Sequence, residues 1–114
     1  MTTQLKNHKS ETQLTTSSAS LVSTSTSETK FIGKVTATNT SASDVVATFW
    51  RLATATTETE GSGGNWIWSK TILAGETVTI DKLQGHVLGN SMKISGKAAT
   101  SSVINVDISG TTET

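Results

Sequence analysis

LAGETVTIDKLQGHVLGNSMKISGKAATSSVINVDISG, the stretch Leu73–Gly110, decides the fold of this chain. It holds three short runs in which apolar and polar residues alternate, and turns that contain glycine separate these runs. Alternation with a period of two places the apolar side chains of a strand on one face. The stretch therefore predicts an antiparallel β-sandwich.

The sequence before this stretch predicts two further strands. Lys30–Asn39, KFIGKVTATN, alternates in the same way, and DVVATFWRLA follows it from Asp44 to Ala53. The turn-forming residues NTSAS lie between the two strands, so we expect a hairpin. The residues predicted on one face of the first strand are Phe31, Gly33, Val35 and Ala37.

The strand predicted over 44–53 is apolar on both faces. Val45, Ala47 and Phe49 share one face, and the other carries Val46, Trp50 and Leu52. Since a strand of a small sandwich normally shows one face to water, a second apolar face predicts a central position or a contact with another subunit. Tryptophan either fills cores or anchors protein interfaces. The candidate subunit-interface residues are Val46, Trp50, Leu52, Trp66 and Trp68.

Length and composition predict a single all-β domain. The chain has 114 residues, enough for one two-layer core. Thr and Ser make up roughly a third of it, which favours strands, and it lacks cysteine, which excludes disulfides. We expect a single antiparallel β-sandwich over residues 12–114, Ig-like or jelly-roll-like, with seven or eight short strands.

Residues 1–11 are predicted to form a flexible, extended N-terminal arm. Leu5 is the arm's only large apolar residue after the initiating methionine, so the arm cannot bury itself on its own domain. Such a segment can order by lying across a neighbouring subunit. Leu5, Lys6 and Lys9 are therefore candidate anchor residues.

Charge and hydropathy argue against nucleic acid and membranes as partners. The formal net charge is zero, whereas a protein that neutralises several phosphates normally has a basic excess. No apolar stretch approaches the roughly 20 residues of a spanning helix, and the N-terminus lacks the apolar region of a signal peptide. We expect a soluble protein that is not secreted.

The residue types needed for catalysis are sparse. The only histidines are His8 and His86, and no G-x-S-x-G motif accompanies them. Thiolate ligands are absent, and only Asp81 lies near His86 along the chain, which argues against a zinc site. We predict no enzymatic activity, no catalytic residues, no metal and no cofactor.

The order of the segments resembles small structural proteins of tailed bacteriophages, over about residues 12 to 110. The motifs that carry the resemblance are TNTS at Thr38–Ser41, AGET at Ala74–Thr77 and GNSMKI at Gly89–Ile94. The resemblance implies a non-enzymatic sandwich that forms a homo-oligomer on the capsid, collar or tail of the virion. Its other partners would then be capsid, portal, connector or tail proteins, and it would be made in the cytoplasm of the bacterial host.

A binding module is the alternative function. Trp66 and Trp68 follow the loop 54–64, and exposed aromatic rings beside polar side chains can stack on sugars. The alternative hypothesis is therefore a carbohydrate- or receptor-binding β-sandwich that uses these two residues and the loop.

Overall fold

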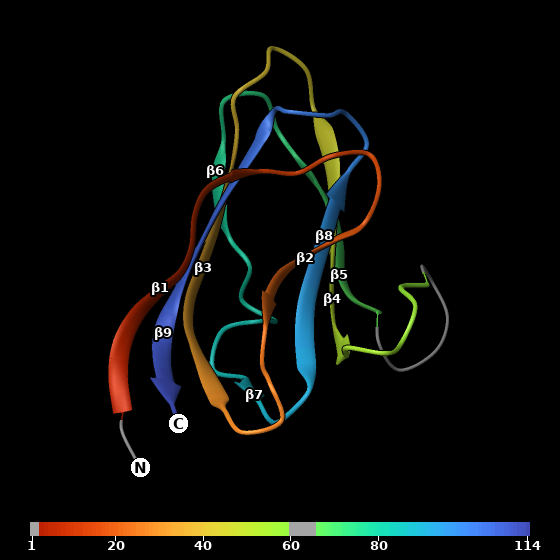
Figure 1. The fold of residues 1–114 in the computed structure, drawn as a ribbon. Helices are drawn as coiled ribbons and strands as arrows, with labels where there is room; N and C mark the ends of the chain where they lie inside the picture. Colours follow the sequence, from red (N-terminus) through yellow and green to blue (C-terminus); the bar gives the residue numbers. More distant parts are fainter. Residues whose placement is uncertain (1–2, 60–65) are drawn as a thin grey trace.

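The computed structural model describes residues 3–59 and 66–114, which fold into two antiparallel sheets facing each other (Figure 1). Sheet A has the order β1-β9-β3-β6, with β7 also paired to β3, and sheet B has the order β2-β8-β4-β5. The strands of sheet A are β1 (Thr3–Gln13), β3 (Thr29–Asn39), β6 (Thr77–Thr79), β7 (Val87–Leu88) and β9 (Ile104–Glu113). Those of sheet B are β2 (Ala19–Ser23), β4 (Val45–Ala53), β5 (Trp66–Ile72) and β8 (Met92–Ala98).

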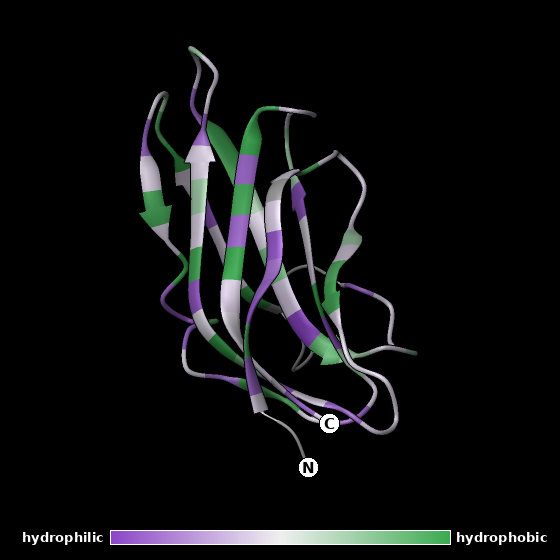
Figure 2. Ribbon diagram, turned by 60° about the vertical axis from the view of Figure 1, so that its left-hand side comes forward, coloured by the Kyte–Doolittle hydropathy of each residue, from purple (hydrophilic) through white to green (hydrophobic). Residues whose placement is uncertain are grey.

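This architecture confirms the predicted all-β sandwich. Hydrophobic and hydrophilic residues alternate along the strands, as Figure 2 shows, and the inward set forms the core. Phe49 and Trp68 meet edge to face in this core, with ring centroids 5.7 Å apart. No helix long and apolar enough to cross a membrane occurs in the part of the chain that is described.

Strands β3 and β4 do not form the predicted hairpin. They belong to different sheets, and the connection between them crosses the top of the sandwich in Figure 1. Asn39, which is fully buried at the end of β3, holds this crossing together. Its amide nitrogen donates to the carbonyl oxygens of Ser43 (2.8 Å) and Ile72 (2.9 Å), and its oxygen accepts from the backbone N–H of Ser41 (2.9 Å). The turn-forming residues thus build an arch between sheets.

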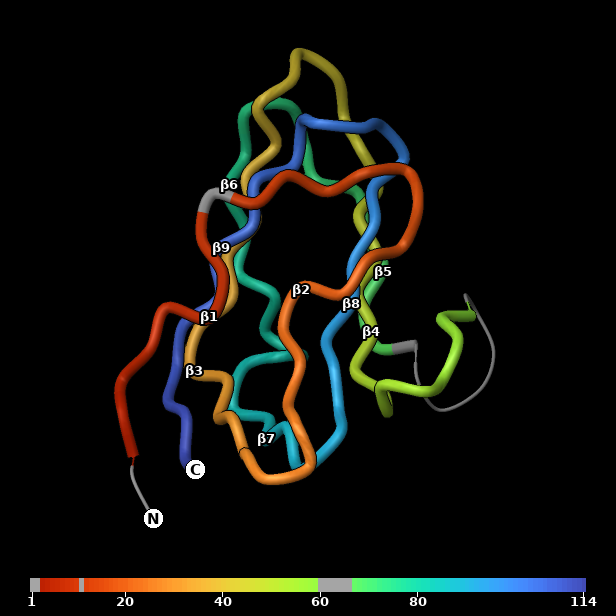
Figure 3. Tube along the Cα trace, in the orientation of Figure 1, coloured from red at the N-terminus to blue at the C-terminus, as the bar shows by residue number. Residues whose placement is uncertain are grey.

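The N-terminal arm requires a correction. Residues 3–13 form strand β1, which pairs with β9 and lies at the edge of sheet A (Figure 1). The prediction counted apolar side chains, but backbone hydrogen bonds to a neighbouring strand need none. Figure 3 shows that this pairing brings the two termini to the same end of the molecule. With β1 included, the described residues contain nine strands, more than predicted.

The part of the outer face of sheet B around Trp50 is covered by the chain itself. The predicted second apolar face of β4 exists, and the segment 54–59 returns to contact it at Trp50. The indole nitrogen of Trp50 donates to the carbonyl oxygen of Thr59 (3.1 Å), and Lys93 of β8 pairs with Glu58 (3.5 Å). Trp50 and Leu52 are consequently buried outside the central core.

Candidate functional site

A row of three apolar side chains and one threonine crosses the outer face of sheet A. Val87 of β7 pairs with Phe31 of β3, Phe31 pairs with Thr111 of β9, and Thr111 pairs with Leu5 of β1. Directly paired residues of antiparallel strands point to the same face, so the four side chains stand side by side. We call them the apolar row. The exposed fractions are 46% for Val87, 42% for Phe31 and 87% for Leu5.

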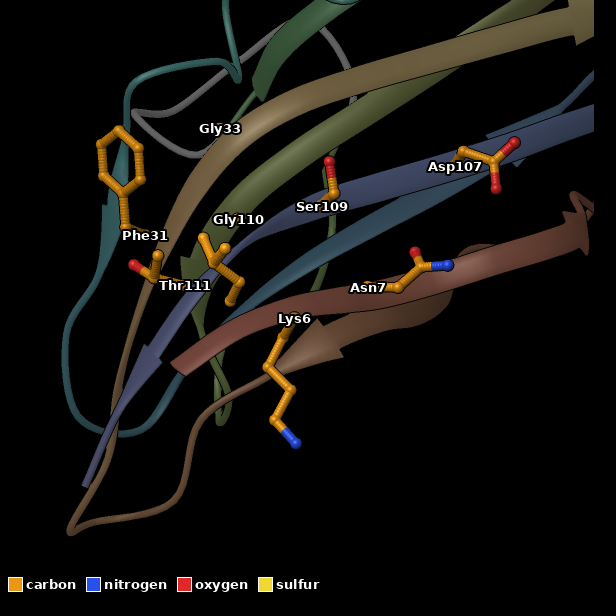
Figure 4. Close-up of a pocket in the computed structure, with 9 residues that line it drawn as sticks. Lys6, Asn7, Phe31, Gly33, Asp107, Ser109, Gly110 and Thr111 are labelled. Carbon is orange, nitrogen blue, oxygen red and sulfur yellow. The ribbon is translucent and has the colours of Figure 1, made fainter. Parts of the chain in front are cut away.

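A shallow groove of about 730 Å³ runs beside the apolar row. Its lining residues are Leu5, Lys6, Asn7, Phe31, Gly33, Asp107, Ser109, Gly110 and Thr111. Figure 4 shows the ring of Phe31 and the hydroxyl of Ser109 directed to one side of the sheet, whereas Lys6 extends to the other. The surface therefore combines exposed apolar side chains with short polar ones.

A bulge in β3 turns Phe31 outward. The register shifts between Ile32 and Lys34, so Gly33 is an extra residue in the ladder to β9. Strict alternation placed Phe31 on the same face as Val35, but the structure buries Ile32 with Val35 and leaves Phe31 exposed. The face predicted for Phe31, which precedes the bulge in the sequence, was therefore wrong. A glycine inside a strand is a recognised bulge signal, and it could have indicated this change of face.

Gly110 lets the bulge pack tightly against β9. A Cβ atom at Gly110 would overlap the carbonyl oxygen of Phe31 and lie 2.9 Å from the backbone nitrogen of Gly33. At Gly33 itself the closest atom to an added Cβ is the carbonyl oxygen of Ser109, at 3.3 Å. The geometry that exposes Phe31 therefore depends on a glycine at position 110.

His8 links β1 to the same bulge. Its Nε2 lies 3.2 Å from the carbonyl oxygen of Phe31, so the imidazole donates across β9 to β3. Partial burial lowers the pKa of His8 below its ordinary value, and nearby Lys30 lowers it further, although the hydrogen bond and Glu28 act in the opposite direction. The contact fastens the strand that carries Leu5.

Val87, at the opposite end of the apolar row, is held from the other sheet. Arg51 of β4 donates from Nη2 to the carbonyl oxygen of Val87 at 2.6 Å. Because the guanidinium spans the gap between β4 and β7, it fixes β7 relative to sheet B. Both ends of the row thus rest on contacts that the sequence pattern did not indicate.

Most of the predicted interface residues are not on the surface. Trp50, Leu52 and Trp68 are buried within this chain, so they are not available to another subunit. Val46, which is exposed, remains accessible on sheet B. The side chain of Trp66 lies outside the described residues. Of the candidate anchors, Leu5 and Lys6 are exposed and Lys9 is half-buried.

Part of the surface that the alternative binding module would use is buried. Trp68 packs against Phe49 in the core and cannot stack on a sugar. Residues 54–59 of the predicted binding loop cover Trp50, and residues 60–64 lie outside the described part of the chain. Of the two tryptophans that this hypothesis uses, Trp68 is buried and the side chain of Trp66 is not described.

The described titratable groups form no metal-binding cluster. Within residues 3–59 and 66–114, no group of three or more His, Cys, Asp or Glu side chains could hold a metal ion. The carboxylate of Glu58 sits beside Lys93 and Ser95. Partial burial raises its pKa, but its interactions with Ser95, with its own backbone N–H and with Lys93 prevail and leave the pKa below its ordinary value. That ion pair fastens the loop over Trp50.

The apolar row is therefore the candidate functional site. It crosses the outer face of sheet A on strands β7, β3, β9 and β1, and it combines exposed apolar side chains with a shallow groove. Exposed apolar patches of this kind are typical of protein interaction surfaces. Comparison of this chain with protein-family models, with curated proteins and with solved structures gave no match.

Proposed function

We propose that this chain is a non-enzymatic structural protein of a tailed-bacteriophage particle, which assembles with copies of itself and with other virion proteins on the capsid, the head-tail junction or the tail. The observation that carries the proposal is the apolar row on sheet A. It leaves Leu5, Phe31 and Val87 exposed on one face of a small sandwich. The order of the turn motifs resembles that of phage structural proteins, and this resemblance favours a phage particle as the assembly.

The surface suits packing against a broad partner. The groove beside the row is lined by short polar side chains such as Ser109 and Asn7, which leave the sheet accessible to a flat partner surface. Apolar anchors surrounded by small polar groups are the usual anatomy of a protein interface. The row would form the apolar centre of the contact, and the polar residues would form its rim.

The experiment compares two variants in particles. Phages that carry the wild-type gene, Phe31→Asp or Val46→Asp are grown, purified and analysed by quantitative mass spectrometry. Both substitutions place a charge on an exposed residue, but only Phe31 belongs to the row, since Val46 lies on sheet B. Circular dichroism of each purified protein checks that it is folded.

We expect the wild-type protein and Val46→Asp to be present in the particles and Phe31→Asp to be depleted at least tenfold, about the effect of losing one buried apolar anchor. Absence of the wild-type protein from purified particles would overturn the structural role. Equal incorporation of both variants would show that the row is not the assembly surface.

A further inference from the structure

The free edge of β1 has the features of a pairing surface. Strand β1 is the last strand of sheet A and pairs with β9 alone among the described residues. Its other side therefore presents the backbone N–H and C=O groups of alternate residues along an eleven-residue strand. Such an edge is a template for another strand unless it is blunted.

Only the second half of this edge has features that discourage pairing with another strand. Register shifts between Asn7 and Lys9 and between Lys9 and Thr12 interrupt the second half of β1, and bulges of this kind discourage pairing. In the first half, residues Thr3 to Asn7 pair with β9 one to one without a shift. The hydroxyl of Thr3 also donates to the Glu113 carboxylate at 3.0 Å, which ties the start of β1 to its neighbour. The regular edge is thus Thr3–Asn7.

Leu5 stands at the centre of this regular edge. It is the most exposed large apolar residue described, at 87%, and it ends the apolar row on the side where the sheet stops. A strand added to β1 would place a side chain beside it and would continue the row. The structure therefore points to a partner strand with an apolar residue opposite Leu5.

We propose that this partner is β1 of a second copy of the chain, paired antiparallel about a two-fold axis at Leu5. The proposal rests on the assembly with copies of itself proposed above and names the surface that makes it. In this register Leu5 opposes Leu5 of the second copy, Gln4 opposes Lys6, and Thr3 opposes Asn7. The two A sheets join, and the apolar row of one copy runs into that of the other.

Charge disfavours a shift of the axis toward the lysines and permits the pairing. An axis shifted by one residue to Lys6 would place two ammonium groups directly opposite each other, which destabilises a strand pair. An axis midway between Lys6 and Lys9 would bring these two lysines together and would run into the bulges. The formal net charge of the chain is zero, so no overall repulsion opposes association.

Disulfide trapping tests the axis directly, because the chain contains no cysteine. Leu5→Cys places two thiols across the axis, within the distance that a disulfide requires. The matched control is Val46→Cys, an exposed apolar residue on the other sheet. We expect mild oxidation to convert most of Leu5→Cys to a covalent dimer, with at least tenfold less from Val46→Cys. Equal yields from the two variants would overturn the proposed axis.

Sedimentation measures the association without cross-linking. We expect the wild-type chain to sediment as a dimer of its 11.9 kDa subunit. Leu5→Lys should sediment as a monomer that remains folded by circular dichroism, whereas Val87→Lys, at the far end of the same row, should stay dimeric. A monomeric wild-type chain that is still incorporated into particles would overturn only the strand pairing. A dimer that is absent from particles would overturn only the virion role.

Discussion

Replacement of Asn39 should test how the two sheets are joined. The side chain is buried where β3 crosses to sheet B, and Asn39→Ala would delete all of its contacts while leaving little room for repacking. Its nitrogen donates to Ser43 and Ile72, and its oxygen accepts from both the backbone N–H and the hydroxyl of Ser41. The substitution therefore removes the hydrogen bonds that hold the arch.

The expected loss follows from these contacts. Each hydrogen bond contributes about 0.5–1.5 kcal/mol net, and the buried carbonyl oxygen of Ile72 would lose its side-chain donor. Asn39→Ala should therefore lower the free energy of unfolding by about 3 kcal/mol, or the Tm by about 12 °C for a domain of this size. Asn39→Asp should cost more, because a buried carboxylate cannot donate to either carbonyl oxygen.

Urea denaturation followed by tryptophan fluorescence measures the effect, and differential scanning calorimetry gives the Tm. The matched control is Asn90→Ala, at an exposed position, which should change the free energy of unfolding by less than about 0.5 kcal/mol. If Asn39→Ala proved no more destabilising than Asn90→Ala, the arch would not depend on this side chain and the reasoning would fail.

Three further predictions concern the bulge, His8 and the core. Gly110→Ala should lower the free energy of unfolding in urea by about 3 kcal/mol, because its Cβ overlaps a carbonyl oxygen of β3, whereas Gly33→Ala should cost less than about 1 kcal/mol. Because the folded protein lowers the pKa of His8, stability should be complete above pH 6.5 and should fall as the pH drops below it, as measured by urea midpoints from about pH 8 to about pH 5. In calorimetry, Trp68→Ala should cost about 3–5 kcal/mol and Val46→Ala less than about 0.5 kcal/mol.

Each of these has a result that contradicts it. Equal losses for the two glycine variants would mean that β9 adjusts to a side chain at position 110. The His8→Gln variant removes the imidazole, so a pH dependence that persists unchanged in it would assign the effect to other groups. A Trp68→Ala protein that kept its stability but lost self-association would return Trp68 to the interface.

The alternating pattern of the sequence was sufficient to predict the sandwich. It also assigned both faces of β4 correctly, because Val45, Ala47 and Phe49 do point into the core and Trp50 does lie on the opposite face. These features depend on the period of a strand, which is a local property of the backbone. Local properties can be read from neighbouring residues alone.

The tertiary structure decided what covers each face and which edges pair. Trp50 is buried by residues 54–59, Phe31 is exposed by the bulge at Gly33, and β1 is ordered by β9 from the other end of the chain. Each outcome depends on hydrogen bonds or contacts that lie outside the strand's own alternation, which leave no periodic signal in the side chains. The sequence alone thus determined the class of the fold and the alternation of apolar and polar residues along its strands. Pairing between distant strands decided which apolar residues remain on the surface, because a strand's own sequence does not specify which segment will lie beside it.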